Sequence, residues 1–349
     1  MLLSDFEFEL TADRIAQAPT VDREAARLLV LDRRSDVLSH RTVADLPELL
    51  TPGDLVVLND TRVFPARLLG RRVPSGGAVE CLLLKQVDEN NWDALVHPGQ
   101  KLGIGATIVF EREEVILYGE VVSRRFHGRR TVNLWVEDGS SVHTAIERIG
   151  HVPLPPYIKR SDVLTDRERY QTVYAAVNGS VAAPTAGLHL TEALLTRLQA
   201  RGIEVARVTL HVGYGTFQPI RVDQVEEHRI ESEPYDVPIA TAGMVNSAIN
   251  EGRRIVAVGT TTTRTLETAF RKSGNRCLLA GGGVSDLYLY PGVTIQVVGA
   301  LFTNFHLPRS SLLVLVSAFA GRERVLAAYD EAARNEYRFY SYGDAMLIL

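Results

Sequence analysis

Polar residues and glycines gather in short clusters at places where predicted strands end. The first cluster follows the apolar run 54–59 and contains Asp60 and Arg62. Asp60 could take up a proton or orient Arg62, and a surface turn led by the aspartate explains the same residues equally well. Ligands of open α/β sheets bind where the strands end, so this cluster is a candidate part of a site.

Three further clusters, at 180–189, 211–217 and 303–308, each carry a histidine. Histidine suits proton transfer because its ordinary pKa lies close to neutral pH, although each of these residues could instead be a satisfied member of the core. Asn304 and His306 are two positions apart, and an extended chain would point both side chains to one face. The candidate residues of the three clusters are Thr185, His189, His211, Gly213, Thr216, Asn304 and His306.

The last two clusters could hold an anion and a nucleobase. Residues 259–264 stand between a predicted strand and a predicted helix, where free amides and the positive helix end favour a carboxylate or phosphate. A threonine that only caps the helix is the alternative. Residues 337–344 are rich in aromatic side chains, on which a base could stack or which could fill a core strand. The candidates here are Thr260, Thr261, Arg264, Arg338 and Asp344.

Two kinds of scaffold are predicted to position these clusters. From 61 to 139, short β-rich runs alternate with glycine-containing turns, which indicates a small antiparallel barrel or sandwich. A helix at 141–149 follows. After 150, strands alternate with helices, which is typical of a largely parallel β/α architecture. Strands are predicted at 27–31, 203–212, 254–258 and 295–301, and helices at 192–201, 241–251, 263–272, 310–320 and 323–336.

With 349 residues, the chain is long enough for about two domains. We predict a discontinuous α/β domain, formed by residues 1–60 and 150–349, and a β domain inserted at 61–149. Apolar residues make up 46% and charged residues 23%, which excludes a disordered or low-complexity chain. The formal net charge of −4 speaks against non-specific coating of DNA.

Basic residues are concentrated in two groups of the segment 61–150. One group lies between 62 and 72, and the other, 124–130, has Phe126 and His127 between its four arginines. Such groups could contact phosphates. Solvated hairpin edges, where positive charge discourages strand aggregation, explain them equally well.

Several common sites are missing from the sequence. It has no P-loop, no dinucleotide-binding glycine motif and no serine nucleophile elbow. Cys81 and Cys277 have neither metal-ligand nor disulfide spacing, so we expect no metal and a reducing cytoplasm. The longest apolar stretch, 312–320, is far shorter than the roughly 20 residues of a membrane span, so we expect no membrane partner. The acidic N-terminus is unlike a secretion signal.

In this order, the clusters resemble the S-adenosylmethionine:tRNA ribosyltransferase-isomerase family of queuosine biosynthesis. The resemblance runs essentially end to end, and a chance match to all of its motifs is excluded by their number. It implies a barrel-like β/α domain with an inserted antiparallel β-barrel. Its most specific stretches are residues 53–67, 179–189, 209–217, 258–261, 303–308 and 337–346.

The resemblance also implies an activity and its partners. S-adenosylmethionine would be the donor of a ribosyl group, which is transferred to 7-aminomethyl-7-deazaguanine at the tRNA wobble position and isomerised. The products would be epoxyqueuosine, adenine and methionine. The implied partners are that tRNA and S-adenosylmethionine, and we expect a cytoplasmic monomer that uses no metal.

The implied chemistry needs proton transfer and anchors for charged groups. We expect Asp60, His211 or His306 to move protons, and Asn304 to orient a ribose or base. Thr260, Thr261 and Arg264 would hold a carboxylate or phosphate. The remaining expected substrate-binding residues are Arg62, Thr185, His189, Gly213, Thr216, Arg338 and Asp344.

The sequence departs from the usual family pattern at a few positions. Glu231 replaces a histidine, Gly299 an aspartate and Ala26 a serine, and Thr262 and Thr263 replace serine and valine. Glu231 changes the charge of its surroundings. Two other hypotheses therefore stay open, namely a relative that acts on another small acceptor and a catalytically silent RNA-binding protein.

Overall fold

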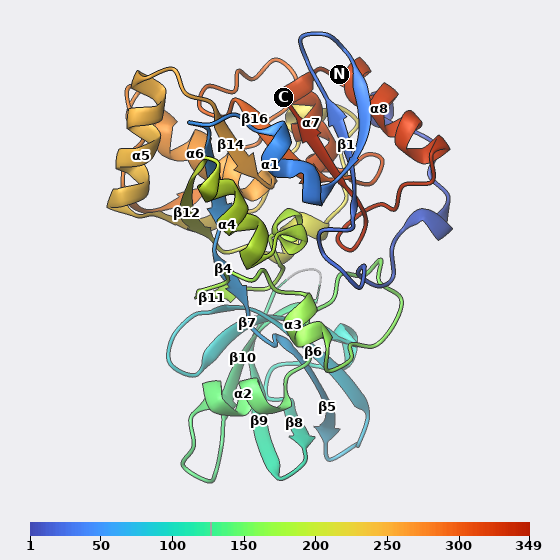
Figure 1. The fold of residues 1–349 in the computed structure, drawn as a ribbon. Coiled ribbons are helices and arrows are strands. Elements are labelled where there is room, and N and C mark those ends of the chain that lie inside the picture. The colour runs from blue at the N-terminus through green and yellow to red at the C-terminus, as the bar shows by residue number, and fades with distance from the viewer. Residues whose placement is uncertain (126–127) are drawn as a thin grey trace.

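The chain forms two bodies that are joined by several segments (Figure 1). The computed structural model describes residues 1–125 and 128–349, so Phe126 and His127 lie outside the described residues. The upper body in Figure 1 is a mixed β-sheet with helices on both faces, and the lower body is a closed antiparallel β-barrel. This confirms the predicted α/β fold with an inserted barrel.

The barrel strands bury every second residue, as in β6, where Val79, Cys81 and Leu83 face the interior. Helix α2 (Val142–Ile149) is capped by Ser141 and packs Ile146 onto the same interior cluster. The strands follow the order β10-β7-β6-β5-β8-β9. Their bounds are β5 (Arg67–Val73), β6 (Ala78–Gln86), β7 (Asn91–His97), β8 (Thr107–Arg112), β9 (Val115–Arg124) and β10 (Arg129–Trp135).

The sheet of the upper body has the order β15-β13-β12-β3-β14-β16-β17-β1-β2. Strands β12, β3, β14 and β16 run parallel, as predicted, and β1 runs parallel to β17. The other neighbours are antiparallel, so the prediction of a largely parallel sheet is wrong for the flanks. There, β1–β2 and β12–β13 are joined without an α-helix, and such neighbours run antiparallel. The bounds are β1 (Arg27–Leu31), β2 (Leu38–Thr42), β3 (Leu55–Asn59), β12 (Glu204–Leu210), β13 (Glu233–Val237), β14 (Ile255–Val258), β15 (Gly281–Ser285), β16 (Ala300–Asn304) and β17 (Ala345–Ile348).

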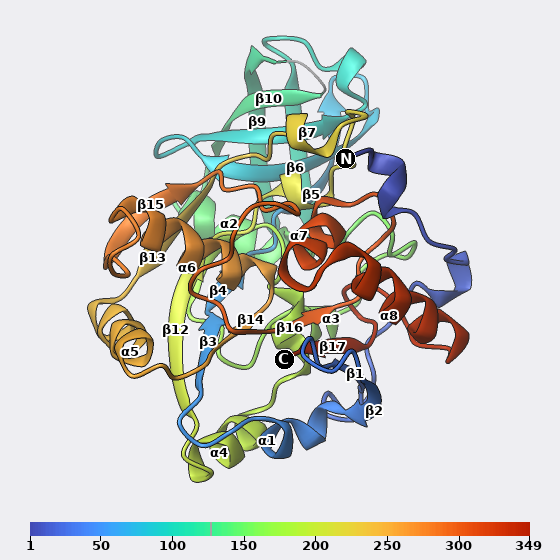
Figure 2. The ribbon, with the colours of Figure 1, turned by 90° about the horizontal axis from the view of Figure 1, so that it is seen from above.

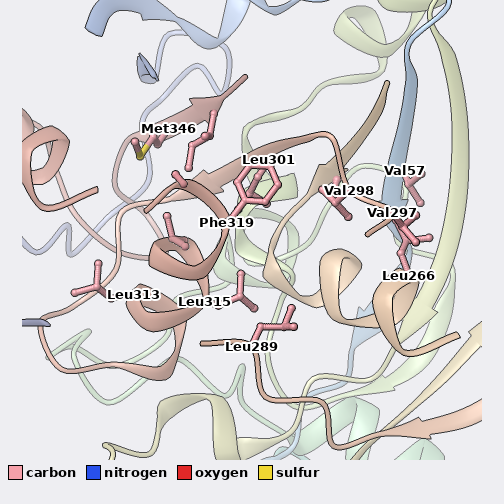
Figure 3. Packing of buried hydrophobic residues seen from close by; sticks show 14 of the residues in the cluster. Val57, Leu266, Leu289, Val297, Val298, Leu301, Leu313, Leu315, Phe319 and Met346 are labelled. Atoms are coloured by element: carbon pink, nitrogen blue, oxygen red, sulfur yellow. The ribbon is translucent and has the colours of Figure 1, made fainter. Parts of the chain in front are cut away.

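Helices cover both faces of this sheet (Figure 2). In β3, Leu55 and Val57 belong to one core cluster and Val56 and Leu58 to another, so the strand is apolar throughout. Helices α5 to α8 pack on the first cluster, part of which is drawn in Figure 3, and α1 and α4 on the second. The helices are α1 (Leu46–Leu49), α3 (Asp166–Arg169), α4 (Glu192–Ala200), α5 (Ile239–Asn250), α6 (Thr260–Lys272), α7 (Ser311–Ala320) and α8 (Arg322–Arg334).

Two predicted boundaries near the candidate clusters are wrong. Helix α6 begins at Thr260 instead of 263, directly after Gly259, whose φ of +89° turns the chain out of β14. The strand predicted at 295–301 is instead β16, Ala300–Asn304. Residues 296–298 are held by the buried carboxylate of Glu267, which accepts their backbone N–H groups at 2.7–3.3 Å.

A small two-stranded parallel pair lies between the two bodies (Figure 1). It consists of β4 (Thr61–Val63) and β11 (Val177–Ser180). The pair brings the chain that follows β3 next to the chain that precedes the 180–189 cluster. The division into residues 1–60 with 150–349 and residues 61–149 stays a prediction.

Candidate active site at the ends of the central strands

The parallel strands β12, β3 and β14 end at one edge of the sheet. Asn59, the fully buried last residue of β3, ties this edge together. Its amide nitrogen donates to the Leu210 carbonyl at 3.0 Å and to the Thr261 hydroxyl at 3.1 Å, and its oxygen accepts from the backbone N–H of Thr61 and Leu210. The polar clusters that follow these three strands therefore lie together.

Two short hydrogen bonds arrange a carboxylate and an imidazole at this edge. The Thr209 hydroxyl donates to Asp60 Oδ1 at 2.7 Å, and Thr61 Oγ1 lies 2.8 Å from His211 Nδ1. Because β3 and β12 are neighbours, the paired residues place Asp60 and His211 side by side at the ends of the two strands. Both residues are half-buried, so each keeps a route to a ligand.

The ring of His211 lies against the backbone of Gly179 in β11. A Cβ atom at position 179 would be 2.8–3.0 Å from Cε1, Nδ1 and Nε2 of the ring. The φ of Gly179 is +144°, a backbone conformation that side-chain-bearing residues rarely adopt. Glycine is therefore required here for two independent reasons.

The surroundings of His211 favour its neutral form. Burial lowers the pKa of His211, and the negative charge of Asp60 opposes that shift. The imidazole is therefore neutral at pH 7. When Nδ1–H donates to Thr61 Oγ1, the Nε2 lone pair is free to accept a proton.

Asn304, at the end of β16, belongs to a second network. The Thr185 hydroxyl donates to Asn304 Oδ1 at 3.0 Å, and Asn304 Nδ2 lies 3.0 Å from His189 Nε2. Burial lowers the pKa of His189 to about 3, and the positive charges of Arg338 and Arg23 act in the same direction. At pH 7, His189 is thus a neutral acceptor that fixes the Asn304 amide.

His306 makes its hydrogen bonds with other residues than Asn304 does, and the expectation that both point to one face stays a prediction. Strand β16 ends at Asn304, so the alternation does not continue to His306. Its Nε2 lies 3.0 Å from Thr303 Oγ1, and its backbone N–H donates to the Tyr329 hydroxyl at 3.1 Å. The residue is 5% exposed, and burial lowers its pKa to about 3. This geometry resembles that of a satisfied core histidine.

Arg264 already has a carboxylate partner within the chain. Its guanidinium pairs with Glu233 of β13 and donates to two backbone carbonyls. Glu233 also accepts from the Gly213 N–H at 2.7 Å and from the Thr216 hydroxyl at 3.4 Å. The positive charge expected to hold a substrate anion is thus neutralised internally, and the buried pair positions the turn after His211.

The first turn of α6 carries Thr260 and Thr261, each 7% exposed. Gly259, which has no side chain, is the residue before the helix, and no side chain within the described residues accepts from the N–H groups of Thr260 or Thr261. Thr262 and Thr263 donate their hydroxyls to backbone carbonyls one turn earlier. The helix start therefore keeps unpaired amides of positive partial charge beside Asn59 and its neighbours.

Residues of the 337–344 cluster are buried and form part of the core of the molecule. The Asp344 carboxylate accepts from the backbone N–H of Arg27 at 3.0 Å and of Arg338 at 2.8 Å, and the residue is 2% exposed. Tyr337 and Phe339 are fully buried in the first core cluster. A nucleobase cannot stack on rings without exposed area, so the core explanation of these two aromatics is right.

A cavity of about 610 Å³ is lined by the barrel, by residues 153–161 and by two residues of the loops near His211. Val181 and Tyr214 belong to its lining, and they come from the loops that hold His211, because the Val181 N–H donates to the Val212 carbonyl at 3.0 Å. The barrel lines the other side, so both bodies contribute. Arg62 is exposed and lines a different cavity, of about 90 Å³, with Asp166.

Several residues of the site are not predicted from the sequence. Thr209, Gly179 and Glu233 each contact a predicted residue, but none of them is among the predicted site residues, although Gly179 and Thr209 lie in the family-specific stretches 179–189 and 209–217. Thr209 lies two residues before His211, and in an extended strand both side chains point to one face, which is a signal that could have found it. Glu233 offered no local signal, because Arg264 is far from it in sequence.

The residues that depart from the usual family pattern lie in different parts of the structure. Glu231 pairs with Arg129 of β10, so it links the two bodies. The carbonyl of Gly299 accepts from Arg33 at 2.5 Å, and a Cβ at this position would lie 3.1 Å from Arg254. Ala26 is fully buried.

Neither a metal-binding cluster nor a membrane-spanning helix is present in the part of the chain that the structure describes. Within 1–125 and 128–349, no three His, Cys, Asp or Glu side chains are grouped so that they could hold a metal ion. No helix in the same residues is long and apolar enough to cross a membrane.

The edge of the parallel strands presents a neutral imidazole, a carboxylate and a helix start with free amides. This is the arrangement of an α/β enzyme. The chain belongs to the queuosine biosynthesis protein family, whose profile matches residues 3–348. An S-adenosylmethionine:tRNA ribosyltransferase-isomerase of Symbiobacterium thermophilum is 50% identical over 349 residues, which covers 100% of both chains. The corresponding protein of Moorella thermoacetica is 48% identical over 349 residues, again covering 100% of both.

A solved structure supports the same assignment. The crystal structure of an S-adenosylmethionine tRNA ribosyltransferase from Thermotoga maritima is 36% identical in sequence, with a TM-score of 0.55. The match covers 99% of this chain and 100% of that one. The fold expected from the resemblance is thus shared with a member of the family.

Proposed function

We propose that this chain is an S-adenosylmethionine:tRNA ribosyltransferase-isomerase. It transfers the ribosyl group of S-adenosylmethionine to 7-aminomethyl-7-deazaguanine at the wobble position of a tRNA, and epoxyqueuosine, adenine and methionine are the products. The observation that carries the proposal is the family match over residues 3–348, with relatives of this name that are about half identical along their whole length.

The reaction begins with removal of a proton from the ribose C5′, which the adjacent sulfonium makes acidic. Loss of adenine follows, the amine of the RNA base adds to the sugar, and ring closure expels methionine. His211 is the proposed base, because it is neutral at pH 7, half-buried and held by Thr61. Asp60 lies beside it and would stabilise the imidazolium that forms.

Two other parts of the edge are proposed to hold the donor. The unpaired amides of Thr260 and Thr261 suit the carboxylate of the methionine portion. The Asn304 amide, fixed by Thr185 and His189, suits a ribose hydroxyl or a base edge. Arg264 would act indirectly, through Glu233 and the turn at Gly213.

The proposed cellular setting is the cytoplasm, where the tRNA substrate is found. Cys81 and Cys277 are free, which suits a reducing compartment. A monomeric state stays a prediction, as does the expectation that no metal takes part.

Release of adenine and methionine, measured with and without the precursor-bearing tRNA, tests the function. We expect release only when this tRNA is present. Release without RNA would favour a relative that acts on a small acceptor. Absence of release, together with retained tRNA binding, would favour the catalytically silent RNA-binding protein.

Alanine variants of the two histidines test the assigned base. We expect His211→Ala to lower kcat by a factor of about 10² to 10⁴, the usual contribution of a general base. His306→Ala is expected to lower the free energy of unfolding and to leave the kcat of the folded fraction largely unchanged. Unchanged turnover in folded His211→Ala would remove His211 from the mechanism.

A further inference from the structure

The cavity lined by Val181 and Tyr214 has a neighbour on the barrel. This second cavity, of about 680 Å³, shares the lining residues Val96 and His97 with the first, and we name the two neighbouring cavities together the basic groove. One end of the groove reaches Val181 and Tyr214, in the loops that hold His211. The other end is lined by Gly99, Gln100, Arg124, Arg125, Gly128 and Arg130.

Positive charge dominates the lining of the basic groove. Its charged residues are Arg67, Glu80, Lys159, Arg160, Arg124, Arg125 and Arg130. Three of the cations are neutralised, because Arg67 pairs with Glu80, Arg160 with Asp166, and Arg125 with Asp93. Within the described residues, no carboxylate pairs with Lys159, Arg124 or Arg130. Lys159 and Arg124 are exposed, so a ligand can reach both.

Arg130 places a buried charge beneath the groove. The residue is 2% exposed, and its guanidinium donates to the carbonyls of Gly99 at 2.6 Å, Arg129 at 2.8 Å and Leu102 at 3.0 Å. These carbonyls satisfy its N–H groups but carry no net charge. A buried cation without a counter-ion is unfavourable, and an anion above it would provide the missing charge.

A further cavity is lined by arginines at the opposite ends of the strands, and the charges of these arginines are mostly neutralised. It lies at the amino ends of β14 and β16, where Arg254 pairs with Asp54 and Arg324 with Asp36. Arg33 donates there to three backbone carbonyls, one of them that of Leu349. Only Arg34 is exposed there without a paired carboxylate among the described residues. This cavity is therefore not the favoured site for a polyanion.

We propose that the basic groove binds the phosphate backbone of the tRNA next to the nucleotide that is modified. The inference rests on the proposed function and adds the surface on which the RNA lies. An enzyme that acts on a base must take that base out of its stack, so the flanking phosphates run past the mouth of the pocket. The basic groove includes Val181 and Tyr214, from the loops that hold His211, and carries the unneutralised cations Lys159, Arg124 and Arg130.

The test is a double variant, Arg124→Gln with Lys159→Gln, whose side chains are exposed and whose loss should leave the fold intact. We expect the Kd for precursor-bearing tRNA, measured by fluorescence anisotropy, to rise about tenfold at ~0.1 M salt. The slope of log Kd against log salt should decrease by about one for each lost phosphate contact. The KM for tRNA should rise in parallel, whereas the KM for S-adenosylmethionine should not change.

Arg34→Gln is the matched control, because it removes one exposed positive charge at the opposite edge. We expect this variant to keep the affinity for tRNA and the salt slope of the parent protein. An unchanged Kd and slope in the double variant, or an equal loss in Arg34→Gln, would overturn the proposal. If the parent protein binds tRNA but releases no adenine, the proposed function fails, and the binding data still decide the groove.

Discussion

At the scale of single residues, the close contact of Gly179 with His211 makes a specific prediction. A methyl group at position 179 would have to displace the imidazole, since a Cβ lies 2.8 Å from Cε1. We expect Gly179→Ala to lower kcat about as strongly as His211→Ala, by a factor of at least about 10². Gly243→Ala is the control, because nothing lies within 4 Å of its Cβ position. A Gly179→Ala protein with normal kcat would show that the ring position does not matter.

The two deeply buried histidines predict how stability depends on pH. Burial lowers the pKa of both His306 and His189 to about 3, whereas an unfolded chain takes up the proton near pH 6.5. Between these values the unfolded state binds more protons, so the free energy of unfolding falls as the pH is lowered. Each histidine contributes up to about 1.4 kcal/mol per pH unit.

Urea unfolding at several pH values checks this contribution. We expect His306→Gln to be less stable at pH 7 and to lose less stability than the parent between pH 6 and pH 4, because one titrating group is gone. His143→Gln, which changes an exposed histidine, is the control for the substitution itself. Equal slopes for His306→Gln and the parent would show that His306 is protonated in the folded state.

At the scale of elements, helix α6 holds two neighbouring segments of the chain in place by hydrogen bonds. Its start lies beside Asn59, and its buried Glu267 accepts the backbone N–H groups of residues 296–298. We expect Glu267→Gln to reduce the free energy of unfolding by about 2 kcal/mol or more, because hydrogen bonds to a charged acceptor are lost in the core. The exposed Glu114→Gln should cost less than about 0.5 kcal/mol. Equal urea midpoints for the two variants would contradict this account.

At the scale of the whole molecule, the pair of Arg129 and Glu231 joins the barrel to the sheet body. Its side chains are 33% and 42% exposed, so the pair should contribute under about 1 kcal/mol to stability. Glu231→Gln frees the charge of Arg129, which is next in sequence to Gly128 and Arg130, two residues that line the basic groove. We therefore expect tRNA to bind a few-fold more tightly and with a steeper salt dependence. Unchanged affinity in a titration with tRNA would place Arg129 outside the RNA surface.

Local patterns in the sequence determined much of this protein. Short β-rich runs separated by glycine-containing turns indicated the barrel strands, Thr191 marked the start of a helix as its cap, and the motifs indicated the family. The polar clusters after β3, β12 and β14 could be placed at one sheet edge, because parallel strands end together.

Partnerships between distant residues were decided only by the tertiary structure. Arg264 met Glu233 instead of a substrate anion, Glu267 held residues that read as a strand, and His306 joined the core while His211 faced Gly179. The sequence alone determined which side chains could do chemistry. Which of them stayed available depended on burial and counter-charge, and both arise from long-range packing that no local pattern encodes.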